Sequence, residues 1–128
     1  MPTADLATLR ALRDRLGAAK EGNRDLDREI HAVFMLPPNA VIHNGMLWNS
    51  YSSSIDAALA LVKRVLPGWI WCARNWEDGR HLASLHPPGT KPNEGGPVWM
   101  VYAPSAPLAI LSALLSALIA QQEAASHG

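Results

Sequence analysis

The side chains that could carry chemistry in this chain of 128 residues are scattered along it rather than clustered. A metal site needs several imidazoles, carboxylates or thiolates around one ion. Five histidines are available: His31, His43, His81, His86 and His127. His81 and His86 are the closest pair, but an odd spacing along one predicted strand directs them to opposite faces of the sheet. The sequence therefore predicts no metal site and no bound cofactor.

The nucleophilic side chains also have simpler roles than catalysis. Residues 52–54 are three serines in front of a predicted helix, where a hydroxyl accepts hydrogen bonds from the first free amides. Cys72 follows Trp71 in a predicted strand, a setting typical of a small buried hydrophobic residue. Glu77 and Asp78 are adjacent in a turn and are expected to be solvated. Since no Gly-x-Ser-x-Gly elbow or phosphate-binding loop occurs, we expect a protein that is not an enzyme.

Aromatic and basic side chains around one predicted hairpin indicate a binding function instead. Exposed indole rings stack on bases or pack against partner side chains, and Arg or Lys contacts phosphate. Trp69 and Trp71 lie two apart in one strand, so they share a face, which we expect to pack against the helices. The predicted binding surface joins the loop at 87–97 to six side chains: Trp48, Arg74, Trp76, Asp78, Arg80 and Lys91.

Charge and composition narrow the classes of partner. Eleven basic and eleven acidic side chains cancel, so no global field attracts nucleic acid or an anionic membrane, and direct sequence-specific nucleic-acid binding is not expected. A single cysteine excludes an internal disulfide. Several charges and no apolar run within residues 1–15 argue against a secretory signal. We expect one domain over 1–122 and a flexible tail over 123–128.

Periodicity and turn residues give an α+β fold. Apolar residues at helical spacing and capping residues predict helices over about 4–20, 25–34, 54–66 and 105–120. Asn44-Gly45 between apolar triplets predicts a hairpin at 40–48, and strands follow at 69–76, 80–86 and 98–103. The expected architecture is an antiparallel sheet packed between helices, an αβα sandwich of order α-α-β-hairpin-α-β-β-β-α.

The last predicted helix is apolar on nearly all sides. Its uncharged run over 108–120 has thirteen residues, fewer than the roughly 20 needed to cross a bilayer, so no membrane span is expected. Such a helix must be covered on more than one side. Packing against the sheet is one solution. Close approach of a helix from a second copy along Ala109, Ala113 and Ala117 is the other.

Three stretches of the chain resemble the phage ABA-sandwich family, small proteins of phages and prophages in which an antiparallel sheet lies between helical layers. They are Arg-Asp-Leu-Asp-Arg-Glu-Ile at 24–30, Tyr-Ser-Ser-Ser-Ile-Asp-Ala-Ala-Leu at 51–59 with Leu-Pro-Gly-Trp at 66–69, and Ala-Pro-Ser-Ala-Pro-Leu-Ala at 103–109. The resemblance implies phage origin and a fold, and it brings no catalytic residues. The proline-rich insertion at 87–97 and the five tryptophans are the distinctive parts.

Two hypotheses of function follow. The first is a non-enzymatic phage or prophage accessory protein in the cytoplasm of its bacterial host. It would bind a bacterial target and antagonise defence, by anti-CRISPR-like occlusion of an effector protein or by sequestration of a nucleotide signal. The alternative is a phage structural or assembly protein that forms a homo-oligomer through its C-terminal helix.

Overall fold

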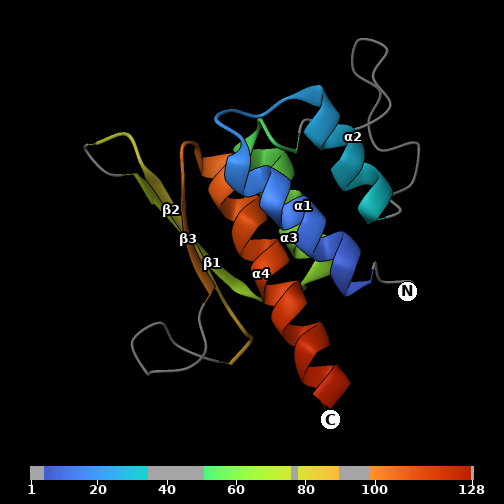
Figure 1. Cartoon of the computed structure of the whole chain (residues 1–128). Coiled ribbons are helices and arrows are strands. Elements are labelled where there is room, and N and C mark those ends of the chain that lie inside the picture. The colour runs from blue at the N-terminus through green and yellow to red at the C-terminus, as the bar shows by residue number, and fades with distance from the viewer. Residues whose placement is uncertain (1–4, 35–50, 76–77, 90–98, 128) are drawn as a thin grey trace.

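The computed structural model describes residues 5–34, 51–75, 78–89 and 99–127, which form four helices and a three-stranded antiparallel sheet (Figure 1). In chain order the elements are α1 (Leu6–Ala18), α2 (Arg24–Val33), α3 (Ile55–Val65), β1 (Ile70–Asn75), β2 (His81–His86), β3 (Trp99–Ala103) and α4 (Ala106–His127). The predicted α+β class, with helices packed on an antiparallel sheet, is confirmed. The predicted hairpin at 40–48 lies outside the described residues.

The first three helices begin at side chains that accept hydrogen bonds from free backbone amides. Asp5, Asn23 and Ser54 accept from the N–H groups three residues further on, at 2.8, 2.9 and 3.2 Å. Ser54 therefore confirms the role in capping expected for the serine run. After α3, Gly68 takes a φ of +82° at the reversal into β1, a conformation in which glycine carries no steric cost.

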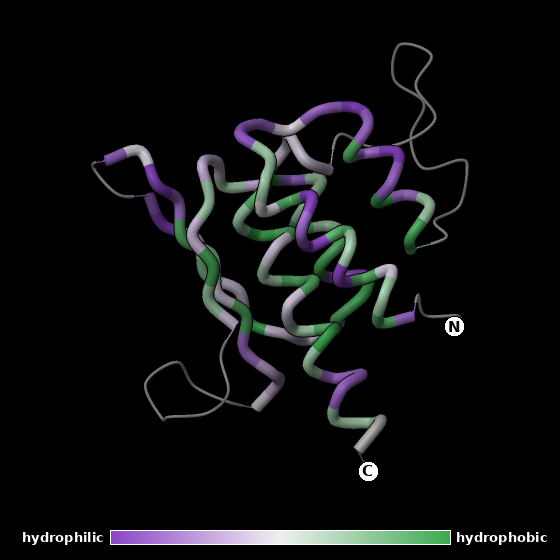
Figure 2. Tube along the Cα trace, in the orientation of Figure 1, coloured by the Kyte–Doolittle hydropathy of each residue, from purple (hydrophilic) through white to green (hydrophobic). Residues whose placement is uncertain are grey.

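Helix α4 forms the middle layer of the molecule. One side of it packs on β2 and β3, and the opposite side packs on α1 and α3, while α2 packs on α1 (Figure 1). The described helices thus all lie on one side of the sheet, and not on both sides as in the predicted αβα sandwich, because α1 and α3 pack on α4 instead of on the sheet (Figure 1). The order of layers is sheet, α4, then α1 with α3. Figure 2 shows the hydrophobic residues concentrated along α4 and on the parts of its neighbours that face it. The core is centred on α4, with Leu108, Leu111 and Leu114 fully buried.

Helix α4 is longer than the sequence suggested. It continues to His127, so residues 123–127, which the sequence predicted to be part of a flexible tail, are helical. Glu123 in this segment forms an ion pair with Arg10 of α1 at 3.0 Å. The stretch Ala106–Ala125 is the one described helix with the length and composition to cross a membrane. Ala109, Ala113 and Ala117 are fully buried inside the chain, so core packing by itself accounts for that composition.

The sheet has strand order β1-β2-β3, and its register assigns side chains to two faces. Ala83 and Leu85 of the central strand are buried beneath α4 on the inner face. Alternate residues point to the outer face, which none of the described helices covers (Figure 1). The register also confirms that His81 and His86 lie on opposite faces.

A buried polar network joins the N-terminus of α2 to the turn before α3. The carboxylate of Asp27 is fully buried and accepts from the Ser52 amide and hydroxyl, both at 2.7 Å, and from Arg24 at 2.8 Å. The Ser52 hydroxyl also accepts from the Asn23 amide at 3.0 Å. A Cβ added to Gly22 would lie 2.0 Å from the Ser52 carbonyl oxygen, so only glycine fits where these segments cross. Two of the stretches that resemble the phage family are therefore in direct contact.

Candidate partner-binding surface

The outer face of the sheet exposes several large apolar side chains. We define it by the side chains that alternation directs away from α4: Ile70, Cys72 and Arg74 of β1, Leu82, Ser84 and His86 of β2, and Met100 and Tyr102 of β3. Ser84 and His86 are buried on this face, so its exposed side chains come from β1 and β3. Met100 and Tyr102 are 56% and 50% exposed, and Ile70 is 39% exposed. Single exposed hydrophobic residues are ordinary, whereas Met100 and Tyr102 project from the same face of β3 and Tyr102 lies beside Leu82 of β2.

One end of the outer face carries a guanidinium group that is held in place. The Arg80 guanidinium lies over the Tyr102 ring, 5.0 Å from its centre, and its Nε donates to the Asp78 carboxylate at 2.7 Å. The Arg80 backbone N–H also donates to Asp78 at 3.1 Å and holds the pKa of that carboxyl below its ordinary value. Arg74 lies on the same rung as Leu82 and Tyr102, which adds a second guanidinium to this end.

The structure places three of the six predicted binding residues. Arg74, Asp78 and Arg80 come together at the end of the β1–β2 hairpin beside Tyr102. Trp48, Trp76 and Lys91 lie outside the described residues, as does most of the 87–97 loop. The sequence prediction did not include Ile70, Met100 or Tyr102. The sequence did contain a signal for them. Ile70, Met100 and Tyr102 alternate along their strands with the inner-face residues Trp69, Trp71, Trp99 and Val101, which assigns the two sets to opposite faces of the sheet.

Two expectations about burial in β1 are wrong. Trp69 is half-buried and packs on Trp99 with ring centres 5.5 Å apart, but Trp71 is 42% exposed although it points to the inner face. Cys72 is exposed on the outer face, where a small buried hydrophobic residue was expected. Trp71 is exposed because α4 covers mainly β2 and β3 and leaves β1 at an open edge. Cys72 is exposed because none of the described helices covers the outer face (Figure 1).

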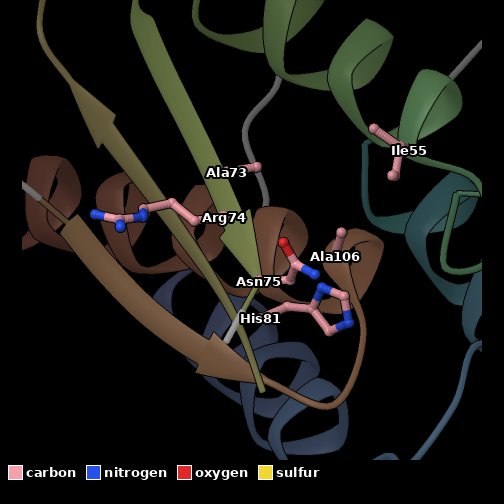
Figure 3. Close-up of a pocket in the computed structure, with 6 residues that line it drawn as sticks. All are labelled: Ile55, Ala73, Arg74, Asn75, His81 and Ala106. Atoms are coloured by element: carbon pink, nitrogen blue, oxygen red, sulfur yellow. The ribbon is translucent and has the colours of Figure 1, made fainter. Parts of the chain in front are cut away.

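A hollow of about 230 Å³ lies beside the inner face of β1 (Figure 3). Its lining comes from β1, the start of β2 and the first residues of α3 and α4: Ala73, Arg74, Asn75, His81, Ile55 and Ala106. In Figure 3 the Asn75 amide and the His81 ring lie beside each other near Ala106, and the Arg74 side chain points away from them. Ala73 leaves room in the hollow because its side chain is a single methyl group.

The other described hollows offer little for catalysis. A hollow of about 400 Å³ lies where α2, α3 and α4 begin and includes Lys20, Ser53 and Ser105, and a further one of about 230 Å³ lies between α1 and α2. Within the described ranges, no group of three His, Cys, Asp or Glu side chains could hold a metal ion. Exposed apolar surface is thus the most distinctive functional feature in the part of the chain that the structure describes.

Comparison with known proteins adds no relative: a scan against protein-family models, a search of curated proteins and a search of solved structures each found no match to this chain.

Proposed function

We propose that this chain is a non-enzymatic binding protein that holds a partner protein against the outer face of its sheet. The observation that supports this proposal is the exposed apolar pair Met100 and Tyr102 on β3, with the half-buried Leu82 beside Tyr102 and a further exposed apolar side chain, Ile70, on β1. A single domain gains nothing for its own stability by leaving these side chains in water. Exposed apolar patches of this kind are typical of interaction sites.

The composition of the outer face defines the partner that fits it. Aromatic residues, methionine and arginine are the types enriched at the centres of protein interfaces. The described outer face carries two guanidinium groups, from Arg74 and Arg80, and its nearby carboxylate, Asp78, is already engaged by Arg80. A complementary partner therefore has an apolar centre that packs against Met100 and Tyr102.

The family resemblance gives this proposal its biological setting. In a phage or prophage accessory protein, the partner would be a protein of the bacterial host, and a bound defence effector would be inactivated by occlusion of its working surface. Sequestration of a nucleotide signal is the less favoured version. Small-molecule sites are concave and bury most of the ligand, whereas the outer face is a broad sheet surface.

The proposal is tested by retaining host proteins on the immobilised chain and comparing the wild type with Met100→Lys/Tyr102→Lys. Both side chains are at least half exposed, so the double variant is expected to fold normally by circular dichroism and to lose the retained protein. Ala60→Lys, at an exposed position of α3, is the matched control and should retain it. A partner that binds the double variant as well as the wild type would exclude the outer face.

A second arm of the same experiment addresses the nucleotide version. Thermal shifts are measured with a panel of cyclic nucleotides for the wild type and for Arg80→Ala. A stabilising shift that disappears in Arg80→Ala, with no retained host protein, would replace the protein-binding proposal with sequestration of a nucleotide.

A further inference from the structure

Strand β1 is an edge strand whose six residues are all exposed. Within the described residues its ladder partner is β2, so the backbone donors and acceptors on its other side face away from the sheet. Long exposed edges of this kind pair with other strands unless prolines, bulges or charges block them. The sequence Ile-Trp-Cys-Ala-Arg-Asn contains no proline and one charged residue, Arg74.

We propose that β1 pairs antiparallel with β1 of a second copy of this chain, about a two-fold axis at Cys72, to form a continuous six-stranded sheet. A two-fold interface brings the same patch of both copies together, so residue i of one copy faces residue j of the other and j faces i. Directly opposed residues lie on the same face of the sheet. The symmetric registers with the most pairs within β1 are therefore centred on Cys72 or on Ala73.

Side-chain size favours the register centred on Cys72. In that register Trp71 of each copy lies opposite Ala73 of the other, on the inner face. Trp71 is a large exposed side chain, and Ala73 lines the 230 Å³ hollow, whose other walls are Ile55 and Ala106 on one hand and Arg74, Asn75 and His81 on the other. In each copy the Trp71 indole and the hollow at Ala73 therefore lie two residues apart. Pairing places the indole of each copy beside the hollow of the other. An aromatic side chain that fills a pocket of the partner is the usual centre of a strong interface, and an indole can also donate a hydrogen bond to a polar lining group.

Charge favours the same register. Centred on Cys72, the pairing places Arg74 opposite Ile70 of the other copy and separates the two Arg74 residues by four positions, about 13 Å along the strands. That distance exceeds the screening length of about 8 Å at physiological salt. Centred on Ala73, the two Arg74 residues would lie two positions apart, at about 8 Å, and Trp71 would face Asn75 instead of a small residue.

The dimer goes beyond the proposed function because it involves no host partner. A two-fold axis perpendicular to the sheet keeps both outer faces on the same side. The dimer would therefore present two copies of Ile70, Cys72, Met100 and Tyr102 as one wide surface. It would also use β1, in contrast to the apolar ridge of α4, which is buried within the chain.

The mass in solution tests the pairing. Light scattering after size-exclusion chromatography, from micromolar to near-millimolar concentration, should give twice the 13.8 kDa of one chain. Trp71→Lys should raise the dissociation constant of the dimer by about tenfold or more. Tyr102→Lys, at a similarly exposed position on β3, should leave it unchanged. A single-chain mass at all concentrations, or a dimer as stable in Trp71→Lys as in the wild type, overturns the proposal.

Oxidation tests the register. The Cys72 register brings the two thiols directly opposite each other, within the range of Cα separations that a disulfide spans. The Ala73 register separates their Cα atoms by about 8 Å, which is too far to bridge. Mild oxidation of the dimer should therefore yield a cross-linked species of twice the chain mass, reversed by a thiol reductant. Cys72→Ser should stay dimeric without cross-linking. A dimer that resists cross-linking, with Cys72 reactive toward maleimide after unfolding, rules out pairing centred on Cys72.

Discussion

Replacing Asp27 with alanine is expected to be one of the most costly single changes in the described structure. Asp27 is fully buried on α2 and accepts three hydrogen bonds, two from Ser52 and one from Arg24. The Ser52 hydroxyl has a second acceptor, the Asn23 carbonyl oxygen at 2.9 Å, so it keeps a partner after the substitution. Arg24 is about one third exposed and can turn to water. The Ser52 amide has neither alternative.

The magnitude follows from that difference. A buried amide left without an acceptor costs about 1–3 kcal/mol, and loss of the charge-assisted bond from the partly exposed Arg24 adds about 1 kcal/mol. We therefore expect Asp27→Ala to lower the free energy of unfolding by about 2–4 kcal/mol, a large part of the roughly 5–15 kcal/mol of an ordinary domain. Asp27→Asn keeps an acceptor for the Ser52 amide but loses the charge, so it should cost less.

Urea titration followed by circular dichroism at 222 nm measures these differences by linear extrapolation. Asp25→Ala is the matched control, because Asp25 is an exposed carboxylate on the same helix, and its change should stay within about 0.5 kcal/mol. If Asp27→Ala cost no more than Asp25→Ala, the network would contribute little to stability and the reasoning about the buried amide would be wrong.

Three further changes have defined outcomes. Gly22→Ala should unfold at clearly lower urea than the wild type because its Cβ would meet the Ser52 carbonyl oxygen, whereas Gly17→Ala, with open space around it in α1, should gain about 0.5–1 kcal/mol. Ser54→Ala should lower the thermal midpoint by removing the α3 cap, at a cost of about 1 kcal/mol, and Ser54→Asp should restore it. The backbone N–H of Thr8 donates to the Asp5 carboxylate and lowers its pKa, so the ionised carboxylate stabilises the fold at any pH above the pKa that Asp5 has in the unfolded chain. This stabilisation is lost as the pH falls through the folded-state pKa. The urea midpoints of the wild type and of Asp5→Ala should therefore converge below about pH 4.

The helices could be predicted closely because their signals are local. Ser54 lies directly before the first residue of α3 and Pro67-Gly68 follows its last residue within three positions, so each end of the helix has a signal beside it in sequence. Gly79, with a φ of +87°, likewise marks the turn between β1 and β2. Helix α4 extends beyond its predicted end because Gln121, Gln122 and Glu123, although polar, are all good helix formers.

The candidate site was only partly predictable because burial is a tertiary property. Alternation establishes that Trp71 and Cys72 point to opposite faces, but it cannot establish how far a helix 35 residues later reaches across the sheet. The same limit applies to Met100 and Tyr102, whose exposure depends on the absence of a described helix over the outer face. Arg80 and Asp78 were predictable since they flank one turn and their pairing needs no distant element.

The place of α4 in the middle of the molecule has a consequence for vectorial synthesis. Each described element that packs against α4 precedes it in the chain and leaves the ribosome first, so the apolar sides of α1, α3 and the strands stay in water until α4 is made. A stalled or truncated product that lacks Ala106–His127 would expose most of what the finished domain conceals, which makes such fragments natural substrates for chaperones and proteases.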